Sequence, residues 1–129
     1  GFSTYQGNQI PKEVKTINVK QEIVSTFFDD QRIGLVFKNN SKDSEYTMEV
    51  YSMNGQLKFR KNFNVAYSTI KMSDGNIIMY NSSQICVMNS RGVQKYMGSV
   101  DGTIRDFFKI GWNKYLMVMD NGVSTIKFS

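Results

Sequence analysis

The sequence predicts an all-β protein made of three consecutive antiparallel sheets. The main evidence is a unit of turns and short apolar strands that recurs about every 38 residues, within the range of repeat proteins. In each unit a polar turn precedes a short apolar strand, at residues 29–37, 74–80 and 111–119. Four-stranded units of about 40 residues are typical of β-propeller blades. The period therefore favours a β-propeller-like architecture of three four-stranded antiparallel blades.

The composition favours strands over helices. Hydrophobic residues make up 40% of the 129 residues and aromatic residues 13%, which is enough to form a folded core. The apolar residues are mainly Ile, Val, Phe, Tyr and Met, which suit strands, whereas Ala, the best helix former, occurs only at Ala66. A chain of this length is expected to form one domain, residues 1–129.

The first blade is expected at residues 23–63. Asn54 and Gly55 form a pair that is typical of a tight hairpin turn, and the turn leads into the fourth strand. In that strand we expect Leu57 and Phe59 to point into the core, because the strand alternates apolar and basic residues. The four expected strands cover residues 23–28, 33–38, 46–51 and 57–60.

The second blade is expected at residues 67–100, with a shorter loop after its second strand. Arg91 and Gly92 hold the place that Asn54 and Gly55 hold in the first blade. This agreement in position supports a true repeat. The expected strands cover residues 67–72, 77–80, 85–88 and 93–96.

The third blade, residues 103–129, supplies one strand fewer than the others. A segment of strand composition, residues 13–20, lies ahead of the first blade, and we expect Ile17 and Val19 to share one side of it. Propellers close by pairing terminal strands, so this lead strand is expected to act as the missing fourth strand. The strands of the third blade are expected at residues 103–110, 114–119 and 123–128.

Three blades are fewer than the four to eight of ordinary propellers. We therefore expect either a homodimer that closes a six-bladed ring, with residues 13–20 of each chain completing the other, or part of a longer propeller. Gly1 in place of an initiator Met fits a piece of a longer protein. One alternative fold remains open: a single closed β-barrel of the lipocalin or fatty-acid-binding type, without an internal repeat.

Two segments, residues 48–57 and 85–93, carry a family resemblance. In each, a strand ends in a polar turn with Gly, and an apolar residue then opens the outer strand. This pattern resembles bacterial quinoprotein-like and WD-repeat-like β-propellers and, in style, an uncharacterised family of Gram-positive surface propellers. That last resemblance implies an extracellular binding or sensing protein, anchored by a membrane helix ahead of the propeller. Since the chain has no His and Trp112 is not followed by Asp, neither the WD hydrogen-bond network nor a quinone cofactor is implied.

The residue types present exclude several kinds of active site. Without His there is no His-based triad and no His metal site. The single cysteine, Cys86, lies within an expected strand, where we expect a buried and unreactive thiol. Carboxylates could act as a glycosidase pair, but most of the aspartates lie in turns, where Asp favours local backbone hydrogen bonds. These aspartates are Asp29, Asp30, Asp74, Asp101, Asp106 and Asp120. We predict no catalytic residue, no metal site and no cofactor.

Trp112 is the one weak candidate for a binding residue. It lies in a turn between Gly111 and Asn113, where an indole can stack on a sugar or a peptide, or fill the gap to the next blade. The net charge of +5 is too small and diffuse for a nucleic-acid binder. We therefore expect a non-enzymatic binding or scaffold module for a protein or a cell-surface polysaccharide. Two alternatives remain open: a carrier barrel for a small hydrophobic ligand, and a carboxylate-dependent hydrolase.

Overall fold

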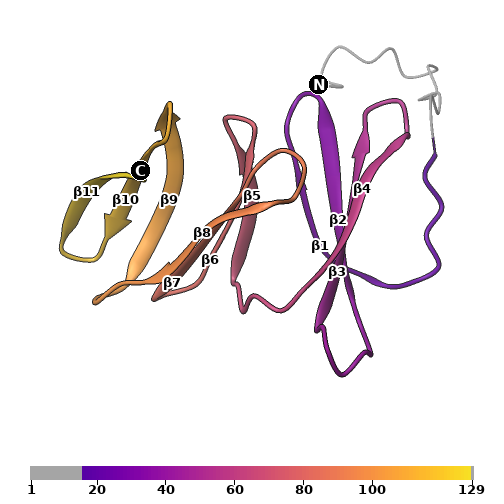
Figure 1. The fold of residues 1–129 in the computed structure, drawn as a ribbon, viewed down its shortest axis with the longest axis horizontal. Helices are drawn as coiled ribbons and strands as arrows, with labels where there is room; N and C mark the ends of the chain where they lie inside the picture. Colours follow the sequence, from indigo (N-terminus) through magenta and orange to yellow (C-terminus); the bar gives the residue numbers. More distant parts are fainter. Residues whose placement is uncertain (1–15, 129) are drawn as a thin grey trace, which may run out of the picture.

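Three separate antiparallel sheets stand side by side in the computed structural model, which describes residues 16–128 (Figure 1). The strand orders are β1-β2-β3-β4, β5-β6-β7-β8 and β11-β10-β9, so neighbouring strands are always consecutive in the chain. The described part contains no helix, and hence none that could cross a membrane. These findings confirm the all-β, propeller-like fold class.

The strands lie close to their expected positions. The first sheet comprises β1 (Ile23–Phe28), β2 (Arg32–Lys38), β3 (Tyr46–Ser52) and β4 (Leu57–Phe63). The second comprises β5 (Thr69–Ser73), β6 (Asn76–Tyr80), β7 (Gln84–Met88) and β8 (Gln94–Ser99). The third comprises β9 (Ile104–Gly111), β10 (Lys114–Met119) and β11 (Gly122–Lys127), one strand fewer than the other two.

The alternative of a single closed barrel is wrong. No ladder of hydrogen bonds joins β4 to β5 or β8 to β9 among the described residues, so each sheet stays open. The chain crosses instead from the last strand of one sheet to the first strand of the next, through residues 64–68 and 100–103. A carrier function that depends on a barrel cavity is therefore not supported.

The middle sheet is buried on both of its faces. Successive side chains of β6 and β7 point to opposite sides, as strand geometry requires, and enter two different hydrophobic clusters. Those that face the first sheet are Ile77, Met79, Cys86 and Met88. Those that face the third sheet are Ile78, Tyr80, Ile85 and Val87. All eight side chains are between 0% and 8% exposed, which explains why both strands are apolar throughout and do not alternate with polar residues.

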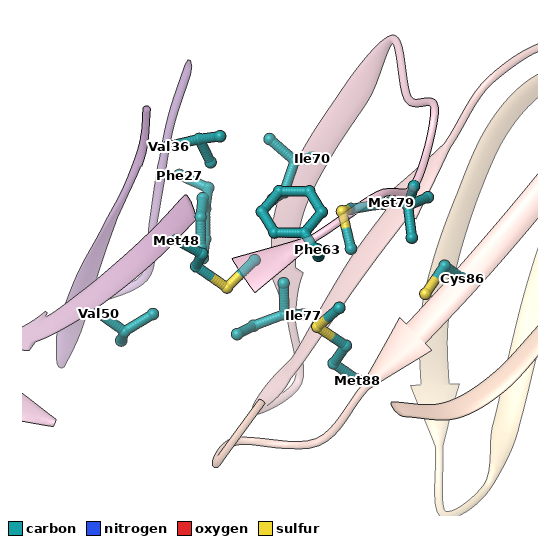
Figure 2. Close-up of a cluster of buried hydrophobic side chains, with 11 residues drawn as sticks. Phe27, Val36, Met48, Val50, Phe63, Ile70, Ile77, Met79, Cys86 and Met88 are labelled. Atoms are coloured by element: carbon teal, nitrogen blue, oxygen red, sulfur yellow. The ribbon is translucent and has the colours of Figure 1, made fainter. Parts of the chain in front are cut away.

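The cluster between the first two sheets is shown in Figure 2, where Met48 extends from β3 toward Ile77 on β6. Val36 and Val50 of the first sheet belong to the same cluster and are fully buried. Interdigitation of apolar side chains from two facing sheets is the packing expected between neighbouring propeller blades.

Glycine at the tight turns lets the sheets approach closely. Gly55 and Gly92 both have positive φ angles, +88° and +80°. Their N–H groups donate hydrogen bonds to the carbonyl oxygens of Ser52 and Asn89 respectively. At Gly92 a side chain is excluded for a second reason, because its Cβ would lie 2.6 Å from the ring of Phe59 in the first sheet. The repeat positions predicted from sequence are thus real turn positions.

The described part of the lead segment lies outside all three sheets. Residues 16–20 form no strand in the single chain, and residues 13–15 fall outside the described residues. Ile17 and Val19 are half-buried while their neighbours are exposed. Val19 lies near Phe37, on the face of the first sheet that points away from the second. Pairing of this segment with another chain stays a prediction.

One prediction for the first blade, the inward position of Leu57, was wrong. Leu57 is 49% exposed and does not point into the core, although Phe59 is half-buried. The ladder between β3 and β4 shifts register between Val50 and Tyr51, beside Leu57. A bulge of this kind re-aims the side chains next to it, and a sequence pattern of alternating residues cannot reveal it.

We predict that Met48→Ala lowers the free energy of unfolding by about 2–5 kcal/mol, because it opens a cavity between two sheets. The matched change Met53→Ala, at a side chain that is 52% exposed, is expected to cost less than about 0.5 kcal/mol. Urea denaturation of both variants measures the difference. An equal loss of unfolding free energy in both variants would contradict the burial of Met48 between the two sheets.

Candidate functional site

The turns that join β1 to β2, β3 to β4, β5 to β6, β7 to β8 and β9 to β10 gather at one end of the three sheets, which we call the turn face. Strands in each sheet alternate in direction, so every second connection lies at the same end. Contacts between turns of different sheets show that these ends coincide. The turn face carries the two pockets that we consider as candidate sites.

Arg32 joins the turns of the first and second sheets. Its Nη1 donates to the carbonyl oxygen of Ser90 at 2.8 Å, and its Nη2 donates to that of Gly75 at 3.2 Å. The carboxylate of Asp29 lies 3.7 Å from the same guanidinium. The side chain of Arg32 is only 14% exposed, so it acts as a fixed bridge between two turns.

A pocket of about 700 Å³ lies between the first and second sheets around Arg32. Both acidic and basic side chains line this pocket. The carboxylate of Asp29 accepts hydrogen bonds from the backbone N–H groups of Gln31 and Arg32, both at 2.8 Å, which confirms the turn-forming role expected for this aspartate. The pocket's ionisable residues are Asp29, Asp30, Asp74, Arg32, Lys58 and Arg91.

A second pocket, of about 300 Å³, lies between the second and third sheets and includes Trp112. We call it the Trp112 pocket. The indole of Trp112 is 87% exposed, so it does not fill a gap between the described sheets. Its binding role stays a prediction. The lining residues are Asn76, Val87, Asn89, Lys95, Lys109, Trp112, Asn113, Tyr115 and Phe128.

Tyr115 anchors the aromatic part of the Trp112 pocket. It is 2% exposed, and its hydroxyl accepts a hydrogen bond from Nδ2 of Asn76 at 2.6 Å. Its ring lies 5.3 Å from that of Phe107 and 5.1 Å from that of Phe128. Burial raises the pKa of Tyr115, so its hydroxyl stays neutral. The third sheet thus presents a rigid aromatic surface to this pocket.

Two lysines supply positive charge to the Trp112 pocket. Nζ of Lys109 donates to the carbonyl oxygen of Asp74 at 3.3 Å and lies 3.7 Å from its carboxylate. Lys95 is exposed and makes no ion pair with any residue between 16 and 128. Among residues 16–128, no acidic residue lines this pocket, in contrast to the first one.

Asp106 forms a separate polar cluster that joins the second and third sheets. It accepts hydrogen bonds from Nζ of Lys71 at 2.7 Å and from the hydroxyl of Tyr80 at 3.2 Å. The bond from Lys71 is the main cause that lowers the pKa of Asp106, and the backbone N–H of Phe107 adds to it. Asp106 lies within β9, so this aspartate links sheets and does not shape a turn.

Cys86 lies in β7 and is fully buried, as expected. Burial raises the pKa of its thiol to about 11, so the thiol is protonated at neutral pH and is a poor nucleophile. Among residues 16–128, no group of three or more His, Cys, Asp or Glu side chains is arranged to hold a metal ion.

Sequence reasoning found Trp112 but missed the side chains that surround it. Lys109, Asn76 and Tyr115 come together across two sheets, and Asn76 is separated from Tyr115 by 39 positions in the chain. No local pattern marks such a contact. The only available signal was that all of these residues flank turns of the repeated unit.

The fold and the pockets define a class of protein: a stack of blade-like antiparallel sheets with pockets between the turns of neighbouring sheets. Residues 1–128 match the Family of unknown function (DUF5711), and the chain belongs to this family. A search of curated proteins gave no match. The resemblance to quinoprotein-like and WD-repeat-like propellers stays a prediction.

We predict that Asp106→Asn lowers the free energy of unfolding by about 1 kcal/mol near neutral pH, since the side chain is 46% exposed and solvent weakens its ion pair. The pKa of Asp106 is lower in the folded chain than the unfolded value of about 3.9. The stabilisation is therefore complete above that value and is lost as the pH falls through the folded pKa.

The measurement is urea denaturation of the wild type and Asp106→Asn over a range of pH, with Asp101→Asn, an exposed aspartate, as the control. The difference between wild type and Asp106→Asn should shrink in acid, and the control should stay close to wild type throughout. A difference that does not change with pH would contradict the role given to Lys71.

Proposed function

We propose that this chain is a non-enzymatic binding module that takes its ligands at the turn face. The observation that supports this most is the position of its two pockets, each of which is formed where turns of neighbouring sheets meet. Loops held by a rigid scaffold are the usual place for binding residues. The buried sheets below the turns provide that scaffold.

The Trp112 pocket is the better of the two candidates. It combines an exposed indole, buried aromatic rings and several amides in a small concave space. Ligand pockets are usually concave and partly aromatic, with a few polar groups that fix the orientation of the ligand. In the pocket around Arg32, by contrast, the central guanidinium is already bound to two backbone carbonyl groups.

The ligand class we favour is a saccharide or a short peptide from a cell surface, in keeping with an extracellular setting. Both can place an apolar face on an indole and exchange hydrogen bonds with amide side chains. A carboxylate-dependent hydrolase finds less support, because the carboxylate of Asp29 is occupied by backbone N–H groups and that of Asp106 by Lys71.

The test is an NMR titration of the isotopically labelled chain with three pools: neutral oligosaccharides, acidic oligosaccharides and short peptides. At least one pool should shift the amide signals of Asn89, Trp112 and Asn113, and not those of residues 39–45 at the opposite end. Trp112→Ala should weaken that binding by about fivefold, since stacking on an aromatic ring contributes about 1 kcal/mol. Phe28→Ala, at another aromatic side chain that is 70% exposed, is the matched control.

Absence of any shift with all three pools would overturn the proposed function. Shifts confined to residues 39–45 would also overturn it, because they would place the ligand at the wrong end of the sheets.

We further propose that the outer face of the third sheet is covered by another blade-like sheet, from a second copy of the chain or from further residues of a longer propeller. Tyr115 and Met117 point inward, so Leu116 and Val118 point to the opposite face. Val123 pairs with Val118 and is 63% exposed. Beyond it, β11 has an unpaired edge among the described strands.

Light scattering tests the homodimer form of this proposal. A mass of two chains is expected for the wild type and a mass of one chain for Val118→Lys, which places a charge on the covered face. Val93→Lys, at a valine of the second sheet that is 47% exposed, should remain dimeric. A wild-type mass of one chain at all concentrations would exclude the homodimer.

A further inference from the structure

We propose that the Trp112 pocket binds a sugar that carries a negatively charged group. This inference rests on the proposed function and names the chemistry of its ligand. It draws on three properties of the same pocket: its aromatic surface, its amide groups and its excess of basic over acidic lining residues.

The aromatic surface suits the apolar face of a sugar ring. The indole of Trp112 is exposed, whereas Tyr115 is buried and held in place by its contacts with Asn76 and Phe107. Phe128 extends the surface, since its ring stacks on that of Tyr96 at 4.0 Å. Fixed rings bury apolar surface of a ligand with little loss of conformational entropy.

The amides of the pocket suit sugar hydroxyl groups. The side-chain oxygen of Asn89 accepts from the backbone N–H groups of Arg91 and Val93 at 2.9 and 3.0 Å, and this leaves its NH₂ group available to a ligand. Asn113 is fixed in the left-handed region at φ +53°, within the turn that carries Trp112. Amide groups both donate and accept, as recognition of several hydroxyl groups requires.

The charge of the pocket favours an anion. Lys95 and Lys109 line it, and no acidic side chain of residues 16–128 does. The carboxylate of Asp74 lies 3.7 Å from Nζ of Lys109 and offsets part of its charge, so the preference for an anion comes mainly from Lys95. The pocket around Arg32 has three acidic and three basic residues and lacks this preference. A carboxylate or a phosphate on the sugar would meet the same two ammonium groups.

Trp112 gives a direct measurement, because it is the only tryptophan in the chain. The probes are trigalacturonate, its fully methyl-esterified form, glucose 6-phosphate and inorganic phosphate. An acidic sugar should change the fluorescence of Trp112. The methyl ester, which keeps the sugar and removes the charge, should bind about tenfold more weakly. Added salt should weaken the binding of the acidic probe.

Two variants separate the role of the charge from general effects. Lys95→Gln should weaken the binding of trigalacturonate or glucose 6-phosphate by about fivefold to tenfold. The matched control is Lys42→Gln, which makes the same change at an exposed lysine in the β2–β3 loop, at the opposite end of the sheets, and should bind normally. Both side chains are exposed, so neither change is expected to disturb folding.

Each result has a defined meaning. Binding of trigalacturonate supports a carboxylated sugar, and binding of glucose 6-phosphate alone supports a phosphorylated one. Equal binding of the methyl ester, or of inorganic phosphate, would overturn the acidic-sugar proposal. If no acidic sugar changes the fluorescence of Trp112 while peptides or neutral sugars shift the turn face in NMR, this inference fails and the proposed function stands. If nothing binds in either experiment, both fail.

Discussion

The structure depends on one constraint: the middle sheet is buried on both faces. Side chains of β6 and β7 supply apolar groups in turn to a cluster with the first sheet and to a cluster with the third. A fully buried side chain of this size contributes about 1.5–3 kcal/mol relative to an exposed one. The two outer sheets therefore depend on the middle sheet, and none of the three is expected to be stable alone.

Polar contacts between the sheets then fix how neighbouring sheets are aligned. Arg32 binds carbonyl groups of the second sheet, and Asp106 of the third sheet binds Lys71 of the second. Apolar packing has little directional preference, whereas these hydrogen bonds hold specific residues of neighbouring sheets next to one another. The pockets of the turn face are a consequence of this alignment, because each is lined by turns from two sheets.

Most of the fold could be predicted from the sequence because its signals are local. The Asn54-Gly55 turn and the short apolar runs of β6 and β7 each lie within a few residues. The strand expected at residues 57–60 is too short, because Arg60, Lys61 and Asn62 are all polar and hide the alternation in burial that continues to Phe63. The residues around Trp112 could not be predicted either, because Lys109 and Asn76 line the same pocket only once two sheets pack together. The sequence predicted the turn that carries Trp112 and left open whether its indole is exposed or fills a gap between blades.

Hydrogen exchange of the backbone amides, followed by NMR, tests the central claim most directly. If the middle sheet is the common core, the amides of β6 and β7 should exchange slowest, and their opening free energy should equal that of global unfolding. The amides of β11 should exchange faster. The account would be contradicted if β6 and β7 exchanged as fast as β11. It would also be contradicted if the first sheet stayed protected after the middle sheet had opened.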